Sequence, residues 1–144
     1  MECEMPQINS NDNEIKKILE NTKIIAVVGC SPKEDKASHI VAKYLKNTGY
    51  KIIPIYPKED EILGEKVYRS LEEIPTNIKI DMVDIFRKPD VIGHVVDAAI
   101  TRGDVQYVWT QLGLVNNEAA QKARDAGLEV VQNKCTKIEH KNLF

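Results

Sequence analysis

The fold is decided by the stretch Ile24-Ile25-Ala26-Val27-Val28-Gly29-Cys30-Ser31, in which a continuous apolar run ends at a glycine. A run of this kind is typical of a strand buried on both faces of a sheet. A helical pattern follows, with Ser38 as its predicted N-cap and Gly49 at its end. The order of strand, glycine turn and helix predicts that a phosphate-bearing ligand lies at the turn.

A second apolar run has the same form and ends differently: Ile52-Ile53-Pro54-Ile55-Tyr56-Pro57-Lys58. Many dinucleotide-binding chains carry an acid here, which binds the ribose hydroxyl of NAD. A lysine at this position favours an additional phosphate on the ribose, as in CoA or NADP. The alternative for Lys58 taken alone is an ordinary surface lysine.

Strands and helices alternate along the rest of the chain. Further strands are predicted over residues 80–86, 105–109 and 128–131, and helices over 12–20, from Pro89 to Gly103 and from Asn116 or Asn117 to Gly127. Between the second and third long strands we expect a turn over 61–64, a very short strand over 66–68 and a capping box around Ser70 and Glu73. Alternation of this kind predicts an α/β fold, a Rossmann-like doubly wound parallel sheet with helices on both faces in three layers.

The composition favours one small domain. The 144 residues are 42% apolar and 29% charged, with a net charge of −2. Nothing in this balance favours a nucleic-acid partner. No apolar run approaches the ~20 residues that span a bilayer. We expect a polar segment with a short helix over 1–21 and the ligand-binding domain over 22–144.

The N-terminus contains acids and no apolar core, so it does not resemble a secretory signal, and a cytoplasmic location is expected. The three cysteines, Cys3, Cys30 and Cys135, match no zinc spacing, and disulfides are not expected in that compartment. Cys135, Glu139 and His140 would make a poor metal site, so no metal is predicted.

Ligands of doubly wound sheets bind at the carboxyl ends of the strands. Backbone amides after Gly29, with Lys36 and Ser38, are expected to face a pyrophosphate. Phe86 would pack against an adenine or a pantetheine arm, Arg87 would pair with phosphate, and Gln111 with the bare backbone of Gly113 would meet a polar group. The predicted site is Gly29, Cys30, Ser31, Lys36, Ser38, Ile55, Tyr56, Pro57, Lys58, Phe86, Arg87, Gln111 and Gly113. Taken singly, several of these residues have a plain alternative, a solvated charge or core packing.

The sequence offers little for catalysis. Cys30 is expected at a helix N-terminus beside lysines, which would lower the pKa of its thiol, but a small buried residue in a glycine turn is the favoured interpretation. His39 and His94 fall within predicted helices and have no evident role. No catalytic residue is assigned, and a binding module is favoured over an enzyme.

Several motifs, in this order, carry a family resemblance: Ala26-Val27-Val28-Gly29-Cys30-Ser31, Val41-Ala42-Lys43-Tyr44-Leu45, Gly49-Tyr50-Lys51-Ile52-Ile53-Pro54, Glu61-Ile62-Leu63-Gly64, Val83-Asp84-Ile85-Phe86-Arg87, Val108-Trp109-Thr110-Gln111-Leu112-Gly113 and Cys135-Thr136-Lys137-Ile138-Glu139-His140. Together, from about Thr22 onward, they resemble the small stand-alone CoA-binding proteins (the YccU-like family). These are similar to the CoA-binding domain of the succinyl-CoA synthetase alpha subunit.

The resemblance implies a Rossmann-type fold with the CoA diphosphate at residues 29–38 and the adenosine near residues 55–58 and Phe86. Two places depart from the family pattern. Lys36-Ala37-Ser38 replaces Arg-Pro-Ser, which loses the forked geometry of arginine. Ile55-Tyr56-Pro57 replaces Val-Asn-Pro, and the bulkier tyrosine would narrow the adenosine site. No ligase domain is seen, so ligase activity is not expected.

The leading interpretation is a CoA or acyl-CoA binding protein without chemistry of its own. An NADP-binding enzyme or redox sensor on the same fold is the first alternative. It is disfavoured because two glycines of the G-x-G-x-x-G pattern are missing and no acid–base pair accompanies the site. The second alternative is an interaction protein with an unoccupied site.

Overall fold

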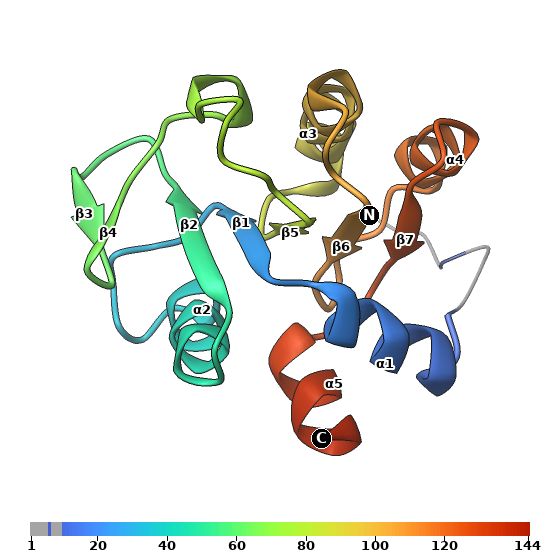
Figure 1. The fold of residues 1–144 in the computed structure, drawn as a ribbon, viewed down its shortest axis with the longest axis horizontal. Helices are drawn as coiled ribbons and strands as arrows, with labels where there is room; N and C mark the ends of the chain where they lie inside the picture. Colours follow the sequence, from blue (N-terminus) through green and yellow to red (C-terminus); the bar gives the residue numbers. More distant parts are fainter. Residues whose placement is uncertain (1–5, 7–9) are drawn as a thin grey trace.

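A parallel five-stranded sheet forms the centre of the molecule (Figure 1). The computed structural model describes residue 6 and residues 10–144. The strands lie in the order β2 (Lys51–Ile55), β1 (Ile24–Val28), β5 (Met82–Ile85), β6 (Tyr107–Thr110) and β7 (Glu129–Val131), and every neighbouring pair is parallel. The predicted parallel sheet is confirmed.

Helices cover both faces of the sheet, which confirms the three predicted layers. Figure 1 shows α1 (Asp12–Asn21), α2 (Ala37–Asn47) and α5 (Thr136–Leu143) on one face. The other face carries the short 3₁₀ helix η1 (Leu71–Glu73), α3 (Pro89–Arg102) and α4 (Asn117–Asp125). Within the described residues, no helix is long and apolar enough to cross a bilayer.

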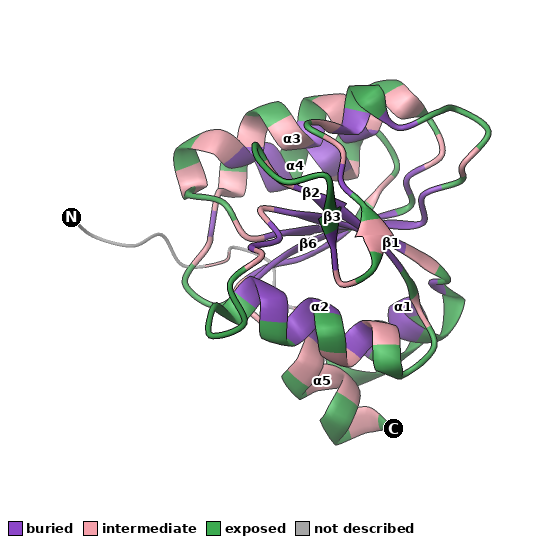
Figure 2. Ribbon diagram, turned by 90° about the vertical axis from the view of Figure 1, so that its left-hand side faces the viewer, coloured by how far each residue is buried: buried purple, intermediate pink, exposed green. Residues whose placement is uncertain are grey.

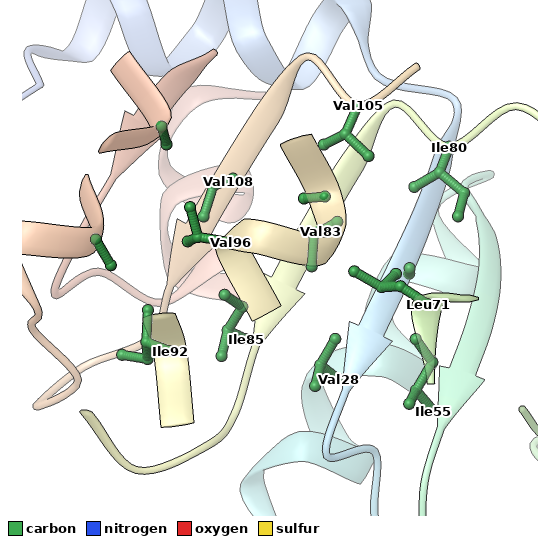
Figure 3. Packing of buried hydrophobic residues seen from close by; sticks show 14 of the residues in the cluster. Val28, Ile55, Leu71, Ile80, Val83, Ile85, Ile92, Val96, Val105 and Val108 are labelled. Atoms are coloured by element: carbon green, nitrogen blue, oxygen red, sulfur yellow. The ribbon is translucent and has the colours of Figure 1, made fainter. Parts of the chain in front are cut away.

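The central strands are buried on both faces, as their unbroken apolar runs require (Figure 2). Alternate side chains enter opposite layers. Ala26 and Val28 belong to the cluster beneath α3 and α4, which Figure 3 shows from close by. Ile25 and Val27 belong to the cluster beneath α1, α2 and α5, where Trp109 is fully buried.

The strand order creates a topological switch point between β1 and β5. After β1 the chain moves through α2 to β2 on one side, whereas after β2 it returns to β5 on the other side of β1. Loops that leave neighbouring carboxyl ends in opposite directions open a crevice, and this crevice is where ligands of doubly wound sheets bind. The turn at Gly29 and the loop that begins at Phe86 both lie there.

The segment between β2 and β5 contains more order than predicted. The turn expected over 61–64 is a hairpin of β3 (Glu61–Ile62) and β4 (Glu65–Lys66), turning at Leu63 and Gly64, both with positive φ. Tyr68 then pairs with Ile55 beside β2, in place of the expected strand over 66–68. The capping box is displaced by one residue, because the Glu73 carboxylate accepts from the backbone N–H of Arg69 and not of Ser70.

Most predicted helix ends are confirmed. Asn116 caps α4 by accepting from the N–H of Ala119, Pro89 occupies the first turn of α3, and Gly103 ends α3 in the left-handed conformation. The prediction that Ser38 is the N-cap of the helix after β1 is wrong. It is the second residue of α2, Lys36 is the N-cap residue, and the Ser38 hydroxyl accepts from the N–H of Ser31.

Helix α5 was not predicted. It packs against α1 and α2, with His140 hydrogen-bonded to Tyr44 (2.9 Å) and stacked on Phe144. Helix α1 buries Ile15, Ile18 and Leu19 in the same cluster as β1. Most of the polar segment expected before α1, including Cys3, lies outside the described residues.

Candidate functional site

The turn after β1 requires a glycine for two independent reasons. Gly29 has a φ of +87°, and a Cβ built there would lie 2.7 Å from the carbonyl oxygen of Phe86. The N–H groups of Gly29 and Cys30 both donate to the carbonyl of Ile55, at 2.9 and 3.2 Å. The close backbone approach predicted for this position is therefore an approach to the neighbouring loop of the protein. The turn ties the carboxyl ends of β1, β2 and β5 together.

The loop from the turn to α2 is held from within. Ser31 accepts from the N–H of Lys33 through its hydroxyl, and its carbonyl accepts from His39 Nδ1 at 2.9 Å. Ser31 and Ser38 are both buried, so their hydroxyls organise the loop. Lys36 is exposed at the entrance of α2, and no side chain of the described residues caps this helix. The amide groups of its first turn therefore remain available to an anion.

A pocket of about 180 Å³ opens on the α3 face of the same edge. Its apolar floor includes Val28 and Ile55, the last residues of β1 and β2, together with Leu71 of η1. Figure 3 labels these three side chains and shows that they come from three separate segments. Polar groups surround this floor: Arg69, Ser70, Glu72, Arg87 and His94.

Three of the predicted site residues are cations on loops at the carboxyl edge: Lys36, Lys58 and Arg87. All three are exposed, and in the described part of the chain none of their side chains forms an ion pair or hydrogen bond. Arg87 lines the pocket directly. An edge that carries unpaired cations beside an uncapped helix suits a ligand with several phosphate charges.

The aromatic residues of the predicted site are half-buried. Tyr56 and Phe86 pack on the cluster of the α2 face, on the opposite side of the sheet from the pocket. Pro57 follows Tyr56 and is exposed. The structure thus brings the ends of β2 and β5 to one edge but distributes their side chains between two faces.

Gln111 has an internal position. Its amide nitrogen donates to Asp84 Oδ1 and to Thr136 Oγ1 (3.1 Å), and the Thr136 hydroxyl donates to Asp84 Oδ2 (3.0 Å). We call these three buried residues the closed cluster. Because burial outweighs the two hydrogen bonds, the pKa of Asp84 rises from 3.8 to about 7.

Gly113 is also engaged within the protein, since its N–H donates to Asn133 Oδ1 at 2.7 Å. The Gln111 side-chain amide and the Gly113 backbone were expected to contact a ligand. In the structure, the N–H donors of both groups are hydrogen-bonded within the protein. Both groups would have to exchange these hydrogen bonds to contact a ligand.

The side chain of Cys30 is fully buried among the residues beneath α2. Burial, followed by the charge of Asp84, raises the pKa of its thiol from 9.0 to about 12. Cys30 precedes the first residue of α2 by several positions, so the helix does not stabilise a thiolate there. The interpretation as a small buried residue in a glycine turn is confirmed.

Two residues of this edge, Arg69 and His94, were not assigned to the site from the sequence. Arg69 lies in the segment after β4, and His94 lies on the exposed side of α3. The helical period of α3 puts His94 on the side opposite Ile92 and Val96. No pattern in the sequence indicated that η1 would line the same pocket as His94. Within the described residues, no group of histidines, cysteines and acids is arranged to hold a metal ion.

Comparison with known proteins identifies the family. Residues 23–141 match the model of the CoA binding domain, and the chain belongs to this family. The uncharacterised protein YneT of Bacillus subtilis is 41% identical over 132 residues, covering 92% of this chain and 96% of YneT. The solved structure of a hypothetical protein from Pyrococcus horikoshii is 43% identical with a TM-score of 0.89, covering 99% of each chain.

A ligase is also similar over part of its length. The ADP-forming acetate–CoA ligase of Methanocaldococcus jannaschii is 38% identical over 72 residues, which are 50% of this chain and 10% of the ligase. The likeness is thus to the CoA-binding region of a much larger enzyme.

Proposed function

We propose that the protein binds CoA or an acyl-CoA at the carboxyl edge of the sheet and has no catalytic activity of its own. One observation carries the proposal. At the carboxyl edge, the uncapped entrance of α2 and the exposed Lys36, Lys58 and Arg87 lie on the segments that follow β1, β2 and β5, and Val28, Ile55 and Arg87 line a pocket of about 180 Å³ at the same edge. Membership of the CoA binding domain family supports the same ligand.

The residues fit the parts of CoA by charge and shape. The amides at the entrance of α2 and Lys36 would hold the diphosphate. Lys58 would hold the ribose phosphate, and Arg87 would pair with phosphate at the mouth of the pocket. Tyr56, Pro57 and Phe86 offer apolar surface to the adenine. Gly29, Ile55, Cys30, Ser31 and Ser38 would shape the site from beneath, because their side chains are absent or buried.

The proposal includes a cytoplasmic location, which agrees with the free cysteines Cys30 and Cys135. Its partner is the small-molecule ligand, without nucleic acid or membrane. The raised pKa of Cys30, at about 12, supports the proposal that Cys30 is not a nucleophile.

Calorimetric titration with CoA, acetyl-CoA, NADP and NAD tests the ligand. We expect CoA or acetyl-CoA to bind and both nicotinamide nucleotides to bind more weakly. Preferential binding of NADP would replace the proposal by the enzyme or sensor on the same fold. Binding of none of the four would favour an interaction protein.

The proposed lack of catalytic activity is tested by a separate measurement. Incubation of the protein with acetyl-CoA, followed by quantification of free thiol, should give the rate of the buffer control, and Cys30→Ser should behave identically. Turnover that disappears in Cys30→Ser would overturn the non-catalytic part of the proposal.

A further inference from the structure

The loop over residues 56–60, which carries Lys58, is clamped by one side chain. A single guanidinium nitrogen of Arg69 donates to the carbonyl oxygens of Tyr56 (3.0 Å), Lys58 (2.9 Å) and Glu59 (2.7 Å). A second nitrogen lies 3.7 Å from the carboxylate of Asp60. One arginine thus contacts almost every residue of the loop.

The backbone alone fixes only the two ends of this loop. The N–H of Tyr56 donates to Tyr68, and the carbonyl of Asp60 accepts from Val67. Between them, the carbonyls of Lys58 and Glu59 accept from no other group of the described chain. Glu59 has a φ of 70°, a conformation that non-glycine residues rarely adopt. The middle of the loop therefore depends on Arg69 for its shape.

Arg69 itself is held by the sheet. The preceding residue, Tyr68, donates to the carbonyl of Pro54 and accepts from Tyr56, and the backbone N–H of Arg69 donates to the carboxylate of Glu73 at 2.8 Å. The guanidinium thus projects from a fixed backbone onto the loop. Arg69 also lines the pocket, so the clamp lies between the pocket and Lys58.

We infer that Arg69 is a positioning residue that sets the discrimination between CoA and CoA lacking the ribose phosphate, by holding loop 56–60 in the conformation that presents Lys58. The inference rests on the proposed function. The three carbonyls engage one guanidinium nitrogen, and Asp60 lies 3.7 Å from a second, so we assign Arg69 a role through Lys58. Direct contact between its remaining N–H donors and the phosphate is the alternative that the double variant below tests. One nitrogen reaches all three acceptors while the second faces Asp60, an arrangement that a lysine could reproduce only in part, because its ammonium lies on a shorter side chain and has no second nitrogen.

The test compares Arg69→Ala and Arg69→Lys with Lys58→Ala, and uses Arg124→Ala as a control that removes an arginine from α4, where it donates to the backbone carbonyl of Val130 away from the pocket and the loop. Two quantities are measured: the ratio of the affinities for CoA and dephospho-CoA, and amide hydrogen exchange over residues 57–61 without ligand. Wild type and Arg124→Ala should prefer CoA by roughly tenfold or more and protect the loop. Arg69→Ala should lose most of the preference and exchange faster at the loop, and Arg69→Lys, with three N–H donors on a shorter side chain, should fall between Arg69→Ala and wild type in both quantities.

The combined variant Arg69→Ala/Lys58→Ala separates positioning from direct contact. It should show no further loss of preference beyond Lys58→Ala. Unchanged exchange together with an unchanged ratio in Arg69→Ala would overturn the inference, as would an additive loss in the double variant. If the wild type does not bind CoA, the proposed function is overturned, and with it the role of Arg69 in discriminating CoA from dephospho-CoA. Amide hydrogen exchange over residues 57–61 would still show whether Arg69 holds the loop.

Discussion

Two groups of polar residues lie at the same edge of the sheet, and only one of them is open to a ligand. On the α3 face, Arg69, Arg87 and His94 surround a pocket. On the opposite face, the closed cluster of Asp84, Gln111 and Thr136 is buried with its hydrogen bonds satisfied internally. A position at the carboxyl end of a strand is therefore not sufficient for a ligand site in this fold.

The difference comes from what covers each face. On one face, Thr136, the first residue of α5, covers the closed cluster and donates to Asp84. On the other face, η1 and α3 leave the pocket open over Val28 and Ile55. A buried carboxyl group needs hydrogen-bond donors, which Gln111 and Thr136 supply. On the open side, Arg87 is exposed and has no ion-pair partner in the described chain, so it is available to an anionic ligand. Substitutions should therefore affect folding on the closed side and binding on the open side.

The border between the two regions should be the most sensitive place. Gly29→Ala is expected to destabilise the fold by about 2–5 kcal/mol, because left-handed strain adds to the clash with Phe86. Gly113→Ala is the matched control, with a φ of 79° and nothing within 4 Å of the added Cβ. It should cost only about 1–2 kcal/mol. Urea unfolding measures both, and equal losses would show that the contact with Phe86 relaxes freely.

On the closed side, Thr136→Val keeps the shape and removes the hydroxyl. We expect a loss of roughly 1–3 kcal/mol in the free energy of unfolding, because a buried Asp84 oxygen loses its donor. CoA affinity, measured on the folded protein, should change less than twofold. A variant as stable as wild type would mean that Asp84 finds another partner, and the closed cluster would then be dispensable.

The closed cluster should also make stability depend on pH. Since the pKa of Asp84 is raised to about 7, the folded protein keeps a proton that the unfolded chain releases above its ordinary value of 3.8. Stability should therefore fall as pH rises from about 4 to about 7, by up to ~1.4 kcal/mol per pH unit from this group. Asp84→Asn should remove this slope from unfolding curves recorded at pH 4, 5.5, 7 and 8. Parallel curves for the two proteins would contradict the raised pKa.

On the open side, Arg87→Ala should leave unfolding within about 0.5 kcal/mol of wild type. It should weaken CoA binding by roughly three- to tenfold, a modest effect because the side chain is exposed to solvent. Raising the salt concentration should reduce the difference between the two proteins. If Arg87→Ala loses stability without a change in CoA affinity, Arg87 has a structural role and is not part of the ligand site.

The sheet was predictable because most of its strands are buried on both faces and therefore appear as largely apolar runs. Helix α5 was missed because its sequence is mostly charged or polar, and its packing depends on Tyr44 and Tyr50 meeting His140. Without α5, Gln111 was assigned to a ligand. One signal was present: Asp84 interrupts an apolar strand, and a carboxyl group in that position requires buried donors.

Arg69 could not be assigned from the sequence for a related reason. Its hydrogen bonds to Tyr56, Lys58 and Glu59 join residues about ten positions apart and follow no local period. The positions of the exposed cations Lys36, Lys58 and Arg87 at the carboxyl edge were easier to predict, since strand ends and loop positions follow directly from the order of elements.

The pairing of Tyr68 with β2 has a consequence for how copies of this protein behave in concentrated solution. A sheet that ends in a bare strand invites another chain to extend it. Here the backbone N–H of Tyr68 donates to the carbonyl of Pro54 on the outer side of β2, so this acceptor is already used. Because Pro54 is a proline, it also lacks the N–H that an added strand would need. At the opposite margin β7 is only three residues long, and the Ser10 hydroxyl donates to the carbonyl of Val130. Both margins of the sheet therefore disfavour strand addition, so the parallel core is protected against edge-to-edge aggregation.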